Sequence, residues 1–297
     1  MGYMPRNIIV LIAGVFACST AVIMIRISTL DPILLSSYRL LVAAVLLSPL
    51  FLRDYRASAA KQSFWLLLRR AFLPGLLLGA HFIFWIMGAR KTPSTNSSLV
   101  VNMVPVVMPF CLYLLARERL NRWELAGTAL AVAGLAVMAG ADLELSSEYL
   151  AGDALCLVSM VLLTFYLALA RRNSAGTPLW LYLVPLYYVG GLFCLACGSV
   201  SANPLAGISG REALLVLGLA VIPTVVGHTS LNYCMRRMRG QSVVLACLGQ
   251  FIFAGILAFF LLGEIPAVMF YPASALVVAG SIIAIWFGPS TVQADSL

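Results

Sequence analysis

Leu115–Gly134 reads LARERLNRWELAGTALAVAG, and Leu261–Gly280, 146 residues further on, reads LLGEIPAVMFYPASALVVAG. Seven of the twenty aligned positions are identical, among them Glu118 and Glu264, which each close one apolar run and precede the next. Apolar runs coincide by chance more readily than mixed ones, so the shared acidic residue is the informative match. The chain therefore contains a duplicated unit of helix, acidic turn and helix, and a repeat of this kind has to be recognised before a fold is assigned.

The composition points to lipid as the main solvent of this chain. Of its 297 residues, 62% are hydrophobic and 10% are charged, whereas soluble domains are about 25% charged. So few charged residues cannot cover a surface that faces water. The net charge of +8 comes from basic residues in short loops beside apolar runs, so it does not indicate nucleic-acid binding, and we expect the lipid bilayer as the partner.

Apolar runs long enough to cross a bilayer occur ten times. A hydrocarbon core about 30 Å thick needs about 20 apolar residues per helix. The longest polar link between the runs is about 53–70. We therefore predict an all-α integral membrane protein with ten transmembrane helices, at about Ile8–Ile25, Ile33–Leu52, Ala71–Ala89, Asn96–Ala116, Trp123–Gly140, Asp153–Ala170, Leu179–Ser199, Ala213–Cys234, Gln241–Leu262 and Ala267–Phe287.

The distribution of cations between alternate loops predicts the orientation of the chain. Fourteen of the nineteen Lys and Arg residues fall on the side that holds both termini, four fall on the opposite side, and Arg39 lies within a span. Cytoplasmic loops carry an excess of Lys and Arg. We therefore expect a multi-pass protein of the cell (inner) membrane with cytoplasmic N- and C-termini.

The repeat and the topology together predict two inverted halves. Each half holds five spans, at 1–145 and 146–297, and an odd number turns the second copy upside down relative to the first. Inverted repeats with a substrate site between them are typical of secondary transporters, which open to either side by exchanging the conformations of the halves. The two halves would form one transport domain.

Several motifs resemble the EamA family of the drug/metabolite transporter superfamily. Gly79–Trp85 resembles the family's third-helix pattern, Gly227–Tyr233 the matching eighth-helix pattern, and Leu262–Pro266 the turn after the ninth helix; the fourth helix keeps Pro105. The ninth helix of the family often carries Glu-Pro where this chain has Gln250-Phe251, so this chain lacks the Glu at that position. The resemblance implies transport of small organic solutes, often export, without ATP.

Polar residues inside spans are costly in lipid and therefore mark candidate sites. Arg39 lies about 9 Å down the second span, where it could anchor an anion or carboxylate or could snorkel to the interface. His81 and His228, the only two histidines, fall at near-equivalent positions of the halves. They could bind substrate or carry a proton, because the unperturbed histidine pKa is about 6.5, or each could bond a backbone carbonyl.

The remaining candidates lie near these three residues in their spans. Trp85 shares a helix face with His81, and Asn232 shares one with His228, at i, i+4 spacing. Asn102 and Gln250 lie mid-span in the fourth and ninth spans, where amides either hold substrate or join helices. Tyr38 could line the cavity or belong to an interfacial aromatic belt. The predicted substrate-binding set is Arg39, His81, Trp85, Asn102, His228, Asn232, Gln250 and Tyr38.

These residues favour a carrier over an enzyme. The sequence has no G-x-x-x-x-G-K-[ST] loop and no H-E-x-x-H motif, so we expect no ATP-driven motor, cofactor, metal centre or catalytic residue. We predict a secondary transporter, and in particular an exporter, of small organic metabolites or amino-acid-like solutes by alternating access. A passive facilitator or channel, and an integral-membrane enzyme using His81 and His228, are the alternatives. A proton is a candidate coupling ion, and a homodimer is a candidate assembly.

Overall fold

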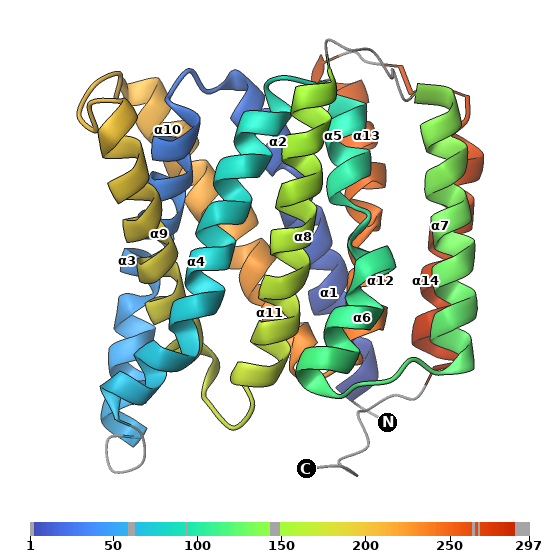
Figure 1. Ribbon diagram of the computed structural model, residues 1–297, viewed down its shortest axis with the longest axis horizontal. Coiled ribbons are helices and arrows are strands. Elements are labelled where there is room, and N and C mark those ends of the chain that lie inside the picture. The colour runs from blue at the N-terminus through green and yellow to red at the C-terminus, as the bar shows by residue number, and fades with distance from the viewer. Residues whose placement is uncertain are drawn as a thin grey trace.

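The computed structural model describes residues 3–58, 63–92, 94–142, 149–262, 265–266 and 268–288, and within these ranges the chain is all-helical. The helices succeed one another as α1 (Tyr3–Ser19), α2 (Ala21–Ile27), α3 (Pro32–Ser58), α4 (Phe64–Ala89), α5 (Ser94–Val101), α6 (Val104–Ala116), α7 (Arg122–Asp142), α8 (Leu150–Asn173), α9 (Leu179–Ser201), α10 (Gly210–Leu219), the π-helix η1 (Ala220–His228), α11 (Thr229–Met235), α12 (Gly240–Cys247), α13 (Gly249–Leu262) and α14 (Phe270–Trp286). They run up and down in one bundle (Figure 1).

Eight segments of the described chain are long and apolar enough to cross a membrane, which confirms a multi-pass membrane protein. Four of them combine consecutive helices: α1 with α2, α5 with α6, α10 through α11, and α12 with α13. The helix α14 is a shorter apolar helix of 17 residues, and α7 is its 21-residue neighbour. The number of ten transmembrane helices stays a prediction.

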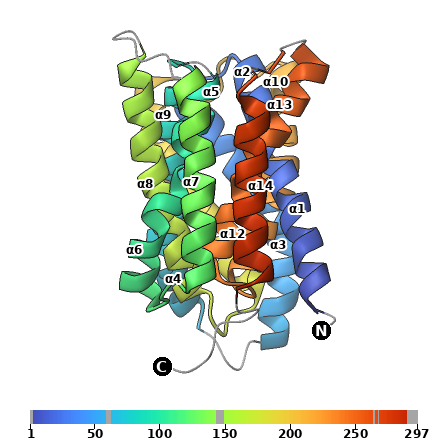
Figure 2. The same ribbon diagram turned by 90° about the vertical axis from the view of Figure 1, so that its right-hand side faces the viewer.

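Two antiparallel helix pairs stand at opposite edges of the bundle. The pair of α3 and α9 lies at one edge and the pair of α7 and α14 at the other (Figures 1 and 2). The second pair approaches closely because Gly127 faces the carbonyl of Gly280 and Gly280 faces the carbonyl of Gly127. Small residues of this kind let helix backbones approach in lipid. The remaining helices fill the space between the two pairs.

Two spans are interrupted in the same way. Between α5 and α6, the amide of Met103 bonds to the carbonyl of Val100 at 3.2 Å, and the amide of Val106 bonds to Met103 at 3.0 Å. Between α12 and α13, Leu248 bonds to Leu245 at 3.1 Å and Phe251 bonds to Leu248 at 3.2 Å. All four bonds join a residue to the third before it, so each span tightens for one turn and then continues.

A third span is distorted by a proline. Pro223 has no N–H to give and its ring crowds the preceding turn, and the span widens into the π-helix η1 around it. The carbonyl of Leu219 then accepts a bond of 2.8 Å from the hydroxyl of Thr224. π-Helical turns of this kind are frequent at functional sites.

An ion network joins the turn before α7, the end of α8 and the turn before α12, at the end of the bundle where α1 begins and α14 ends (Figure 2). Glu118 binds Arg171 at 3.1 Å and Arg239 at 3.4 Å, and Glu124 binds Arg239 at 2.7 Å. Glu118 also accepts a 3.0 Å bond from the amide of Gly240, the first residue of α12, so it anchors a turn and faces a helix N-terminus. Its repeat equivalent, Glu264, lies outside the described residues.

Candidate functional site

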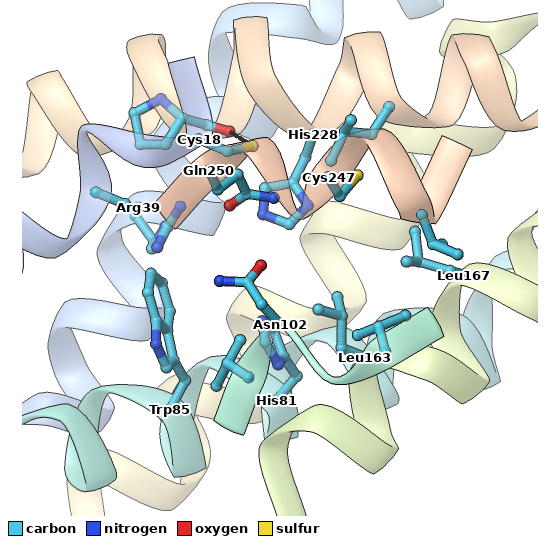
Figure 3. A pocket seen from close by; sticks show the side chains of 16 residues that line it. Cys18, Arg39, His81, Trp85, Asn102, Leu163, Leu167, His228, Cys247 and Gln250 are labelled. Carbon is cyan, nitrogen blue, oxygen red and sulfur yellow. Dashed lines mark hydrogen bonds between the residues drawn. The ribbon is translucent and has the colours of Figure 1, made fainter. Parts of the chain in front are cut away.

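A cavity of about 50 Å³ lies inside the bundle and receives side chains from both halves of the chain (Figure 3). Such a volume holds a few water molecules, so a larger solute requires the helices to separate. Helices α7, α9, α10 and α14 contribute none of the described lining residues. The wall is made by Cys18, Ala21, Arg39, His81, Trp85, Val101, Asn102, Val104, Leu163, Leu167, Pro223, His228, Leu231, Val244, Cys247 and Gln250.

Arg39 reaches the cavity from α3 and is completely buried. Its Nε and Nη2 donate to the hydroxyl of Thr224 at 3.1 and 3.0 Å. Its guanidinium carbon lies 4.0 Å from the ring centre of Phe82, as a cation–π contact requires. Its Nη1 has no hydrogen-bond partner among the described residues. The buried cation therefore retains donors that can bind a ligand.

The two histidines line the same cavity but differ in their bonding. His81 Nδ1 lies 3.0 Å from the carbonyl of Ser159 and 2.7 Å from its hydroxyl. His228 Nδ1 lacks a hydrogen-bond partner within the described part of the chain. The ring of Phe82 contacts both histidine rings. It meets the ring of His228 edge-on with 5.2 Å between centroids, and its centroid lies 5.0 Å from that of His81. His81 is thus held in place, whereas His228 keeps a free ring nitrogen.

The two amides enter the cavity at the two helix breaks. Asn102 belongs to the turn between α5 and α6, and Gln250 follows the turn at Leu248. Both side chains point into the space between Arg39 and the leucines in Figure 3. Trp85 lies beside Arg39 in that view, and its ring stacks on that of His81 with 6.0 Å between centroids.

The structure places two predicted residues away from the cavity. Tyr38 is half-buried, and its hydroxyl donates to the carbonyl of Pro204 at 2.5 Å. Asn232 is buried, and its Nδ2 lies 2.5 Å from the hydroxyl of Tyr166 and 2.7 Å from the carbonyl of His228. Both side chains join helices or loops in this conformation. Their role in substrate binding stays a prediction, and the six other candidates form the site described here.

Thr224 is the residue that sequence reasoning missed. Its hydroxyl holds two nitrogens of Arg39 and is itself aimed by its bond to Leu219 in the π-helix. The signal was available, because a proline at position 223 inside an apolar run predicts a local break with freed carbonyls. Among the described residues, no group of three or more His, Cys, Asp and Glu could hold a metal ion.

Comparison with known proteins agrees with the resemblance read from the motifs. Residues 5–140 match the model of the EamA-like transporter family. A protein described as an uncharacterized transporter from Archaeoglobus fulgidus is 26% identical over 256 residues, which cover 85% of this chain and 87% of that protein. The aromatic amino acid exporter YddG of Ancylobacter novellus is 28% identical over 172 residues, 55% of this chain and 56% of its own length.

A solved structure with no stated activity shares the fold. It superposes with a TM-score of 0.76 at 19% sequence identity and covers 96% of this chain and 98% of that one. At this identity the likeness concerns the fold alone. The family model and the two relatives are what connect the chain to transport.

Proposed function

We propose that this chain, whose residues 5–140 match the model of the EamA-like transporter family, is a secondary transporter that moves a small organic solute across the plasma membrane by alternating access. The solute would bind in the central cavity, against Arg39, His81, His228, Asn102 and Gln250. The observation that carries the proposal is this convergence of five polar side chains, from both halves of an apolar chain, on one enclosed space. Polar groups are kept in lipid mainly where they serve a path or a site.

The broken helices support a transport role. Secondary transporters bind substrates where discontinuous helices free backbone groups near the bilayer midplane. Here Asn102 lies in one break and Gln250 follows another, 148 residues apart in sequence. Both breaks can supply backbone groups to a ligand without exposing them to lipid, where each unpaired group would cost several kcal/mol.

Two inverted repeats, 1–145 and 146–297, together with ten spans, would explain the helix pairing. A two-fold axis in the membrane plane would bring equivalent helices together, and α3 pairs with α9 while α7 pairs with α14. It would also give each contact an equivalent, as the approach of Gly280 to the carbonyl of Gly127 is matched by that of Gly134 to the carbonyl of Ala273. The two breaks, at Met103 and Leu248, are close to equivalent under the repeat's shift of 146 residues.

Orientation and direction follow from charge and from the relatives. The end of the bundle that carries Glu118, Arg171 and Arg239 also carries most of the cations, which supports a cytoplasmic position for this end. Export is the proposed direction, since one relative is named as an exporter. A proton as coupling ion and a homodimer as assembly belong to the same proposal.

The test is transport by the purified chain in proteoliposomes loaded with a labelled panel of amino acids and organic acids. We expect His81→Ala and His228→Ala each to lower the efflux rate of the transported compound by about tenfold, a loss of about 1.4 kcal/mol in transition-state stabilisation. Ser199→Ala, at the exposed end of α9, should leave the rate unchanged. Wild-type rates in both histidine variants would refute the cavity as the path.

The response to an imposed pH gradient distinguishes a proton-coupled carrier from a passive facilitator. A carrier coupled to protons accumulates its solute against a concentration gradient when a pH gradient is imposed, whereas a facilitator only equalises concentrations. An enzyme is disfavoured because the family model and both relatives are named for transport.

A further inference from the structure

The cavity contains one buried charge and no described residue that neutralises it. Arg39 is 0% exposed, and its only hydrogen-bond acceptor among the described residues is the neutral hydroxyl of Thr224. None of the ion pairs formed within the described ranges includes it. Buried cations in membranes are normally paired with an acid or with carbonyls. Within the described part of the chain, the guanidinium therefore lacks the partner that its burial calls for.

The unpaired part of this charge faces the ligand space. Nη1 of Arg39 is buried and has no acceptor among the described residues, and in Figure 3 the guanidinium lies against the space occupied by Gln250 and Asn102. A guanidinium fits the two oxygens of a carboxylate, and charge-assisted bonds of this kind are about twice as strong as neutral ones. A carboxylate of the ligand would supply the missing acceptor.

The opposite end of the cavity is apolar. Figure 3 places Leu163 and Leu167 of α8 across the space from Arg39 and Trp85, with Asn102 between. A ligand that spans the cavity would therefore meet a cation at one end and aliphatic side chains at the other. This distribution fits a small acid with an apolar body.

The same wall disfavours an ammonium group. None of the sixteen described lining residues is Asp or Glu. In an α-amino acid the ammonium is one carbon away from the carboxylate, so it would lie beside Arg39 whenever the carboxylate binds there. Like charges held together in a poorly solvated space repel each other. In a zwitterion, the attraction between the carboxylate and Arg39 is therefore partly cancelled by the repulsion between the ammonium and Arg39.

We propose that the cavity selects organic anions, namely small monocarboxylates with an apolar body, over zwitterionic amino acids of the same shape. The carboxylate binds Nη1 of Arg39, and the body extends toward Leu163 and Leu167. This inference rests on the proposed transport function and narrows its substrate class, so it separates this chain from the relative named for aromatic amino acids.

The test compares four phenyl compounds of similar size and shape that carry different charges: 3-phenylpropionate (anion), phenylalanine (zwitterion), 3-phenylpropanamide (neutral) and phenethylamine (cation). Each is titrated against the purified full chain, and affinity is read from the shift in melting temperature, since a ligand raises it only by binding the folded state. We expect 3-phenylpropionate to bind at least tenfold more tightly than the other three. Equal or tighter binding of phenylalanine or the amide, or no shift with 3-phenylpropionate, would overturn the proposal.

Substitutions at Arg39 test whether its charge causes the preference for 3-phenylpropionate. Arg39→Gln should abolish the difference between 3-phenylpropionate and its amide, and Arg39→Lys should keep part of it, because lysine retains the charge without the planar fork. Arg26→Gln, at an exposed position of α2, should bind like wild type. A preference that survives Arg39→Gln would also overturn the proposal, and the wild-type comparison decides the matter even if that variant does not fold.

Counterflow in proteoliposomes separates the two proposals. If 3-phenylpropionate binds with the expected preference but no compound of the panel crosses the membrane, the transport function fails and the anion site stands. If phenylalanine exchanges faster than 3-phenylpropionate, transport stands and the anion preference fails.

Discussion

Replacing Glu118 with Gln is expected to destabilise the fold by about 3 kcal/mol. The side chains of Glu118 and Arg171 are 3% and 9% exposed, and they bind at 3.1 Å. Removing one member of a buried ion pair costs about 3–5 kcal/mol, because it leaves the other charge uncompensated. The low end applies here for two reasons: Arg239 keeps its 2.7 Å contact with Glu124, and the Gln oxygen can still accept from the amide of Gly240, as the carboxylate does at 3.0 Å.

The ion pair between Arg239 and Glu124 explains why Arg239 is less affected than Arg171 by the loss of the Glu118 charge. Its hydrogen bond to Glu124 raises the pKa of Arg239 above its ordinary value, so this arginine stays charged and paired when Glu118 is neutral. Arg171 has no second carboxylate among the described residues; it donates instead to the carbonyls of Met235 and Met238. The loss therefore falls on Arg171.

The assay is equilibrium unfolding in mixed micelles, with the free energy of unfolding compared between wild type and variants. Asp54→Asn is the matched control, because its partner Arg53 is 66% exposed and such surface pairs contribute about 0–1 kcal/mol. Adding Arg171→Met to Glu118→Gln should recover part of the loss, since both charges are then removed. A Glu118→Gln variant no less stable than Asp54→Asn would refute the reasoning.

Two further predictions concern packing and the arginine's support. Gly127→Val or Gly280→Val should each cost about 1–3 kcal/mol of unfolding free energy by overpacking the contact between α7 and α14, and the double variant should cost less than the sum because the two glycines share one contact. Thr224→Val removes the only described acceptor of Arg39, so it should cost about 1.5–3 kcal/mol in the same assay, whereas Thr224→Ser, which keeps the hydroxyl, should not.

Eight spans of the described chain were readable from sequence because hydropathy and helix length are both set by the bilayer. The run predicted at Ala71–Ala89 ends where α4 ends, although α4 begins earlier, at Phe64. The interruption at Met103 carried the same signal as η1, because Pro105 lies inside the apolar run there, whereas the one at Leu248 was not readable because the apolar run continues through that residue. Distant side chains bond to carbonyls beside both interruptions: Gln241 donates to the carbonyl of Pro105 and Ser281 to that of Leu245, each at 3.0 Å.

The candidate site was predictable as a set of polar residues but not as a geometry. Arg39 and Tyr38 are adjacent, and successive residues of an α-helix point about 100° apart, so only one of them can face the cavity. Asn232 lies one turn beyond His228, which is far enough to meet Tyr166 instead. The spacing along a helix predicts which residues share a face. How far the cavity extends along that face depends on the packing of the other helices and cannot be predicted from the spacing.

Under the proposed mechanism, Arg39, which has no acidic partner among the described residues, also predicts how the transporter turns over. Alternating access requires the cavity to close toward both sides, and the empty cavity would enclose Arg39 without an anion. On insertion scales an arginine at a helix centre costs about 2.5–3.5 kcal/mol. If a bound carboxylate removes about 2.7 kcal/mol of this cost from the closed state, it favours closure by about 100-fold. We therefore expect 3-phenylpropionate to exchange across the membrane much faster than it leaves vesicles without an external anion. In Arg39→Gln, the ratio of the exchange rate to the rate of net efflux should fall toward one. A ratio equal to that of wild type would show that the charge of Arg39 does not affect the transport step.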